Sequence, residues 1–129
     1  MAGSRFPESM DTLARDIIAG LQQRLGSAVY DFAVSETRDA PTPWLTIECT
    51  MFDYLPLVFF YDRGRCGFSI DYGSRKIRLA RPRGPAGLRS HEDLERFLDE
   101  VVVAARERVP DKFLAARGWS EPSSEPAGR

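Results

Sequence analysis

The sequence of 129 residues contains few of the residue types that carry chemistry and no long apolar segment. It has one histidine and two cysteines, and no run approaches the ~20 apolar residues of a membrane-spanning helix. The N-terminal stretch MAGSRFPESMD lacks the basic and apolar regions of a signal peptide. Two cysteines are too few for a disulfide framework. These absences predict a cytoplasmic protein with free thiols, no membrane contact and no cofactor.

Motifs of common enzymes are also missing. The sequence contains no P-loop, no G-x-G-x-x-G, no H-E-x-x-H, no G-x-S-x-G and no C-x-x-C. His91 is expected in the first turn of a helix, with no second metal ligand nearby. Cys66 follows Arg63 and Arg65, whose guanidiniums can lower a thiol pKa, but neither a general base nor an oxyanion site accompanies it. We therefore predict neither catalytic nor metal-ligating residues, and an enzyme using His91 or Cys66 ranks third among the alternatives.

Composition indicates one globular domain. Hydrophobic residues make up 43% of the chain and charged residues 29%, with a net charge of −1. The predicted domain covers residues 9–119, with flexible termini at 1–8 and 120–129.

Helical patterns lie at both ends of this domain. Apolar residues at helical spacing predict a helix over 10–25, with Ser9 as its N-cap and Gly26 as its stop. A second helix is predicted from Ser90, which with Asp93 resembles a capping box, to about Arg108. One or two further helical turns are expected over 111–117.

Between the helices, a two-residue alternation predicts five strands. The first, over 29–37, is expected to be half-buried, with Tyr30, Phe32 and Val34 on one face. The others have the sequences LTIECTMF, LVFFYD, FSIDY and KIRLA. Hairpin-length connections require antiparallel neighbours. The predicted fold is an α+β two-layer sandwich, a five-stranded antiparallel meander with the N- and C-terminal helices packed on one face.

The strand 57–61 is apolar on both faces, so helices that cover one side leave apolar side chains on the other. The sequence leaves open whether Val58 and Phe60, or Leu57, Phe59 and Tyr61, occupy the uncovered face. The expected neighbours on that face are polar: Thr46, Glu48, Thr50, Ser69, Asp71 and Arg78. An apolar stripe with a polar rim is typical of an interface. Intramolecular cover by Phe113 and Trp119 is the alternative.

Basic residues gather after this strand. Residues 63–89 contain eight basic residues and one acidic residue, Asp71. Such a segment can attract an acidic protein or a phosphate backbone. Solvated turns, and a genome that favours arginine (only two of 18 basic residues are lysine), form the competing explanation. The predicted partner-binding residues are Phe59, Phe60, Tyr61, Arg63, Arg65, Arg75 and Arg78.

The run Val109-Pro110-Asp111-Lys112-Phe113-Leu114-Ala115-Ala116-Arg117-Gly118-Trp119, after an acidic amphipathic helix, resembles the ending of small bacterial immunity proteins encoded beside contact-dependent or polymorphic toxins. The resemblance implies a cytoplasmic inhibitor that binds a toxin domain and needs no cofactor. We therefore expect a non-enzymatic domain that binds a protein partner or a second copy of itself. Nucleic-acid binding through the same surface is the second alternative.

Overall fold

The computed structural model of the chain describes residues 6–82 and 87–119. Within these ranges the elements follow the predicted order, with one additional 3-10 helix. They are α1 (Met10–Leu25), η1 (Gly26–Ala28), β1 (Val29–Arg38), β2 (Trp44–Met51), β3 (Leu55–Asp62), β4 (Arg65–Asp71), β5 (Lys76–Ala80), α2 (His91–Glu107) and α3 (Asp111–Ala116). The predicted flexible stretch 120–129 and part of 1–8 lie outside the described residues.

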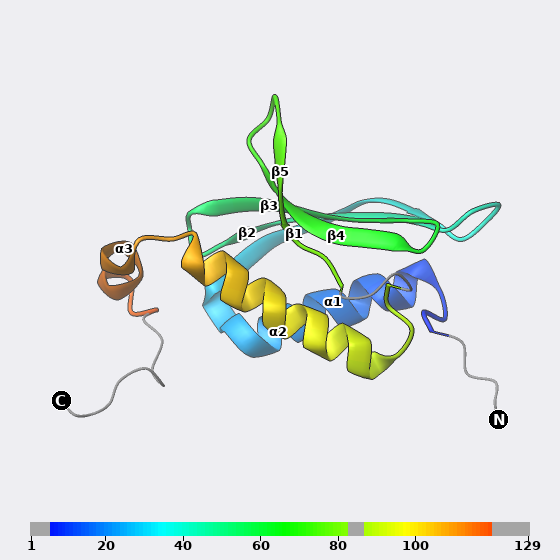
Figure 1. The fold of residues 1–129 in the computed structure, drawn as a ribbon, viewed down its shortest axis with the longest axis horizontal. Coiled ribbons are helices and arrows are strands. Elements are labelled where there is room, and N and C mark those ends of the chain that lie inside the picture. The colour runs from blue at the N-terminus through cyan, green and yellow to red at the C-terminus, as the bar shows by residue number, and fades with distance from the viewer. Residues whose placement is uncertain (1–5, 83–86, 120–129) are drawn as a thin grey trace.

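The five strands form one antiparallel sheet in the order β1-β2-β3-β4-β5, which confirms the predicted meander. Both long helices, α1 and α2, cover the same face of this sheet (Figure 1). The result is the predicted α+β two-layer arrangement, in which no helix of residues 6–82 or 87–119 lies on the other face of the sheet. We call that side the open face.

The helix ends follow from their capping residues. Ser9 Oγ accepts a hydrogen bond from the Thr12 amide, and Gly26 ends α1 with a positive φ of 54°. Ser90 Oγ accepts from the Asp93 amide at 3.1 Å. In a capping box the Asp93 carboxylate would accept a hydrogen bond from the Ser90 amide. Here it accepts from the amide of the preceding residue, Arg89, at 2.9 Å.

The alternation of β3 decides which of its side chains face the helices. Leu57 and Phe59 are buried at 2% and 0% exposure, whereas Phe60 remains 39% exposed. The ring of Phe59 lies 5.2 Å from Phe68 of β4 and 6.4 Å from Phe97 of α2 (centroid distances). Leu57, Phe59 and Tyr61 therefore point toward the helices. Val58 and Phe60 belong to the open face, which answers the question that the sequence leaves open.

The prediction for β1 is wrong in its burial pattern. Most of β1 is exposed, and Tyr30 and Val34 do not share a face. Tyr30 lies opposite Thr50 on the open face, while Val34 lies opposite the buried Ile47. The cause is an irregularity between Tyr30 and Ala33, beside Asp31 with its positive φ of 60°, which inserts one extra residue and reverses the alternation.

The C-terminal aromatic residues do not cover the open face. Phe113 packs edge-on against Tyr54 at a centroid distance of 4.9 Å, and Trp119 lies 5.9 Å from Phe52. Arg117 donates to Asp53 at 3.1 Å, and Asp53 also accepts from the Tyr30 hydroxyl. These bonds hold the pKa of Asp53 below its usual value. Helix α3 is therefore attached to the β2–β3 turn, at one end of the sheet (Figure 1).

The two phenylalanines in the middle of β3 test this assignment of faces. Phe59→Ala removes a fully buried ring, so we expect it to lower the free energy of unfolding by roughly 3–5 kcal/mol. Phe60→Ala truncates a ring that is already in contact with water and should cost less than about 1 kcal/mol. Urea denaturation of both variants measures the difference. Equal losses, or a larger loss for Phe60→Ala, would contradict the assignment.

Candidate functional site

The structure does not bring all the predicted partner-binding residues together: two are buried, and the others are exposed at different places. Phe59 and Tyr61 lie on the helix-covered side at 0% and 7% exposure, so neither presents a surface to a partner. Phe60 lies on the open face, opposite Gly67 of β4. The predicted aromatic stripe is thus reduced to Phe60, because its apolar neighbour Val58 is only 8% exposed.

The four arginines that are predicted to bind a partner do not lie at one place either. Arg63, in the β3–β4 turn, is paired with Asp62 at 2.9 Å. Arg75 lies in the β4–β5 turn, at the opposite end of β4. Seven residues of extended chain place these turns about 20 Å apart. Arg63 and Arg75 therefore do not belong to one cluster.

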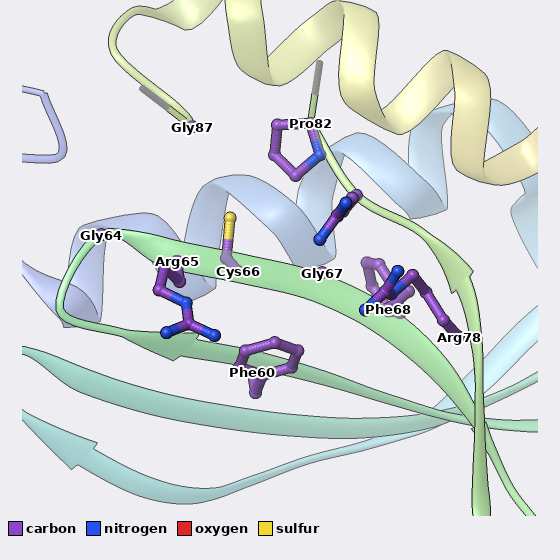
Figure 2. Close-up of a pocket in the computed structure, with 10 residues that line it drawn as sticks. Phe60, Gly64, Arg65, Cys66, Gly67, Phe68, Arg78, Pro82 and Gly87 are labelled. Carbon is purple, nitrogen blue, oxygen red and sulfur yellow. The ribbon is translucent and has the colours of Figure 1, made fainter. Parts of the chain in front are cut away.

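Arg65 and Arg78, the other two arginines predicted to bind a partner, line one cavity together with Phe60. The cavity has a volume of about 570 Å³ and lies beside the first half of β4 (Figure 2). Arg65 and Phe60 contribute from the open face, and Arg78 reaches it from β5. The full lining consists of Phe60, Gly64, Arg65, Cys66, Gly67, Phe68, Arg78, Arg81, Pro82 and Gly87. We call this space the arginine cavity.

The pairing of β4 explains why a cavity forms at this place. Among the described residues, β5 pairs with Phe68 to Asp71 only, so Arg65, Cys66 and Gly67 extend beyond the end of β5. The pairing is irregular between Phe68 and Ser69, where β5 contains one extra residue, so β5 reaches less far along β4. The chain then leaves the sheet at Arg81 and Pro82, and no strand of the described residues fills the space between them and β4.

Two close backbone approaches hold the walls of the arginine cavity. A Cβ atom on Gly67 would lie 3.0 Å from the Ala80 carbonyl oxygen and 3.2 Å from Arg81 Cβ, so glycine lets Arg81 pass against β4. A Cβ on Gly87 would lie 2.7 Å from the Gly64 carbonyl oxygen, and Gly87 has a positive φ of 72°. The contact at Gly87 requires glycine, and at Gly67 any side chain would push Ala80 and Arg81 away by a few tenths of an ångström.

The electrostatics of the cavity are one-sided. Arg65, Arg78 and Arg81 all line it, and no acidic residue does so in the described part of the chain. Over the same residues, none of these three guanidiniums has a hydrogen-bond or ion-pair partner. Arg24 differs, because it binds Glu95 and Asp99 at 2.6 and 2.8 Å. As far as the structure describes the chain, the cavity therefore presents three unpaired cationic groups to whatever enters it.

The two residues considered for catalysis, Cys66 and His91, lie on different elements, β4 and α2. Burial raises the pKa of the Cys66 thiol to about 12, and that of Cys49 likewise to about 12. Cys66 is therefore a neutral thiol, although it lines the arginine cavity. His91 is exposed at the start of α2, with Nε2 4.0 Å from an Asp16 carboxylate oxygen. Within the described ranges, no group of three histidine, cysteine or acidic side chains is placed to hold a metal ion.

Sequence reasoning missed Arg81, Pro82 and the two glycines as parts of one site. Arg81 belongs to the basic segment 63–89, but no sequence pattern places it beside Gly67. The predicted strands FSIDY and KIRLA are equally long, and only the structure shows that β4 begins at Arg65 and is two residues longer than β5. A short last strand leaves part of its neighbour without a partner, and the arginine-rich chain that follows must pass beside that gap.

Comparison with known proteins gives no relative: no family model, no curated protein and no solved structure matches. No helix in the described part of the chain is long and apolar enough to cross a membrane.

Alkylation of the two buried cysteines tests whether the pKa of their thiols is raised. With a pKa of about 12, each thiol should be alkylated by iodoacetamide at pH 8 on the order of a thousandfold more slowly than a free thiol. Because this pKa lies above the unfolded value of about 8.5, the burial stabilises the fold fully below about pH 8.5. That contribution is lost as the pH rises toward about 12.

Mass spectrometry of the native and urea-unfolded protein measures both reactions. Rapid native alkylation of Cys66 at pH 8 would show an activated thiol and would reopen the interpretation of Cys66 as a nucleophile.

Proposed function

We propose that the protein is a non-enzymatic binding domain that recognises an acidic protein partner through the arginine cavity and the adjoining open face. One observation carries this proposal: in the described part of the chain, three guanidiniums without ionic partners line one cavity together with an exposed aromatic ring, at the sheet face that no described helix covers. A protein that is acidic overall, with a net charge of −1, concentrates cations at this one place.

Arginine and an exposed aromatic ring are the side chains that contribute most at protein interfaces. Phe60 supplies a ring that is already 39% exposed and is held in a strand, so little conformational entropy is lost on binding. The guanidiniums of Arg65 and Arg78 can each receive a carboxylate in a bidentate geometry. Their charge also accelerates the encounter with an acidic surface.

An inhibitor of a toxin domain fits this description, as the resemblance of the C-terminal run implies. It would act by covering an acidic region of the toxin, and it would need neither a cofactor nor a nucleophile. A neutral Cys66 and an exposed His91 are compatible with such a passive role.

Nucleic-acid binding through the same surface is less favoured. A single strand crossing the open face would pass Glu48, which is exposed opposite Val58, and Glu36, which accepts a hydrogen bond from Trp44 Nε1. These carboxylates repel phosphates. If nucleic acid were nevertheless the partner, affinity would fall steeply with salt. Absence of retention on an RNA or DNA column at low salt would exclude it.

Charge reversal in the cavity tests the proposal. We expect Arg65→Glu/Arg78→Glu/Arg81→Glu to lose a stoichiometric protein partner that the tagged wild-type protein captures from nuclease-treated lysate of its own organism, because three attractive contacts become repulsive. Quantitative mass spectrometry of the captured proteins measures the loss, and we expect it to exceed tenfold.

A matched variant, Arg15→Glu/Arg108→Glu/Lys112→Glu, changes the net charge equally at exposed residues of α1, of the C-cap of α2 and of α3, none of which lines the cavity. It should retain the partner. Capture that is equal for all three proteins, or lost equally in both variants, would contradict a specific role for the arginine cavity, provided that circular dichroism shows each variant to be folded.

A further inference from the structure

We propose that the arginine cavity is also a binding site for a small phosphate-bearing ligand of the nucleoside diphosphate or triphosphate class. The inference rests on the same residues as the proposed function but does not require the protein partner. Three features of the cavity carry it: the number of free guanidiniums, the position of the exposed ring, and the walls that limit its extent.

The charge of the cavity suits a compact polyanion. Arg65, Arg78 and Arg81 bring three positive charges to one space of about 570 Å³, with no acid among its described lining residues. One carboxylate has two oxygens and a single charge, so it can occupy only one guanidinium fork. A diphosphate carries several charges on many acceptor oxygens within a few ångströms. Arginine is well suited to such groups because its planar donors match phosphate oxygens bidentately.

The aromatic ring suits the remainder of such a ligand. Phe60 is the lining aromatic residue that retains exposed surface, since the other, Phe68, is 0% exposed. In Figure 2 Phe60 lies beside Arg65, on the opposite side of β4 from Cys66. A planar base can stack on the Phe60 ring while its phosphates lie among the guanidiniums, a combination that recurs in nucleotide recognition.

The walls favour a small ligand over a long chain. One wall is the contact between Gly87 and the Gly64 carbonyl, and another is Arg81 against Gly67. Both are built from backbone in close approach and cannot open by a change of side-chain rotamer. The cavity volume of about 570 Å³ falls within the range of roughly 300–1,000 Å³ that is usual for small-molecule sites.

The ligand would be held without covalent chemistry. Cys66 lines the cavity as a neutral thiol, because burial raises its pKa to about 12. It therefore offers no thiolate for attack on phosphorus. The site binds and releases its ligand, and an occupied cavity leaves Arg65, Arg78 and Arg81 unavailable to a protein partner.

The test is a titration of the purified protein with three probes: ADP, pyrophosphate and adenosine. We expect ADP to bind most tightly, pyrophosphate about fivefold or more weakly, and adenosine not measurably at millimolar concentration. Calorimetry measures the affinities. In the amide spectrum by nuclear magnetic resonance, ADP should shift the signals of residues 60, 65–67, 78, 81 and 87 and leave those of α3 unchanged.

Variants separate the two halves of the ligand. Arg78→Gln and Arg81→Gln should each weaken ADP and pyrophosphate alike, by about tenfold. Phe60→Leu should weaken ADP about fivefold and leave pyrophosphate unchanged. The matched controls Arg15→Gln, in α1, and Arg108→Gln, at the C-cap of α2, change exposed residues that do not line the cavity and should alter neither affinity.

A variant without any loss of charge tests the construction of the cavity. Gly67→Ala places a Cβ within 3.2 Å of Arg81 Cβ, so Arg81 must move and ADP should bind several-fold more weakly. Gly73→Ala, in the β4–β5 turn, is the glycine control: a Cβ there meets nothing within 4 Å, and the strain of alanine at its positive φ of 85° lowers stability without altering the lining of the cavity. Thermal unfolding confirms that both variants are folded.

The results distinguish this inference from the proposed function. Absence of ADP binding would overturn the inference, and so would ADP binding that the cavity variants leave unchanged. Either result would leave the proposed binding of an acidic protein to be decided by partner capture. Equal affinity for pyrophosphate and ADP, with no effect of Phe60→Leu, would overturn the nucleoside part. Binding of ADP without any captured protein would support the inference and contradict the proposed partner.

Discussion

The packing of Phe59 against Phe68 and Phe97 determines most of the architecture. These three rings, from β3, β4 and α2, lie with centroids 5.2 to 6.4 Å apart, and each is almost completely buried. Because side chains alternate along a strand, burying Phe59 places Phe60 on the other face. The same contact that attaches α2 to the sheet therefore presents the one exposed ring of the candidate site to solvent.

The site itself depends on incomplete strand pairing rather than on any single residue. β5 covers only part of β4, and the chain that follows returns to β4 through contacts that two glycines permit. Arginines that would be ordinary surface residues on separate turns thus come to line a common space. The structure leaves them without counter-charges in the described residues, and an arrangement of like charges of this kind is most stable when an anion is bound.

Local patterns allowed the fold to be predicted closely, but not the site. Helix α1 begins and ends where Ser9 and Gly26 indicate, and the meander follows from the hairpin spacings. The predicted face of β1 was wrong because a bulge at Asp31 cannot be read from alternation. Phe59 and Phe60 could not be assigned because both faces of β3 are apolar. Arg81 and Gly67 meet only through tertiary approach, which no sequence spacing encodes.

The exposed β1 strand has a consequence for the behaviour of the protein in concentrated solution. An unpaired outer edge ten residues long is normally a template on which another chain can extend the sheet. Two irregularities, between Tyr30 and Ala33 and between Val34 and Glu36, interrupt the regular spacing of donors and acceptors along this edge. An incoming strand would meet an edge whose register changes twice, and such irregularities disfavour edge-to-edge addition of another chain while leaving the open face accessible.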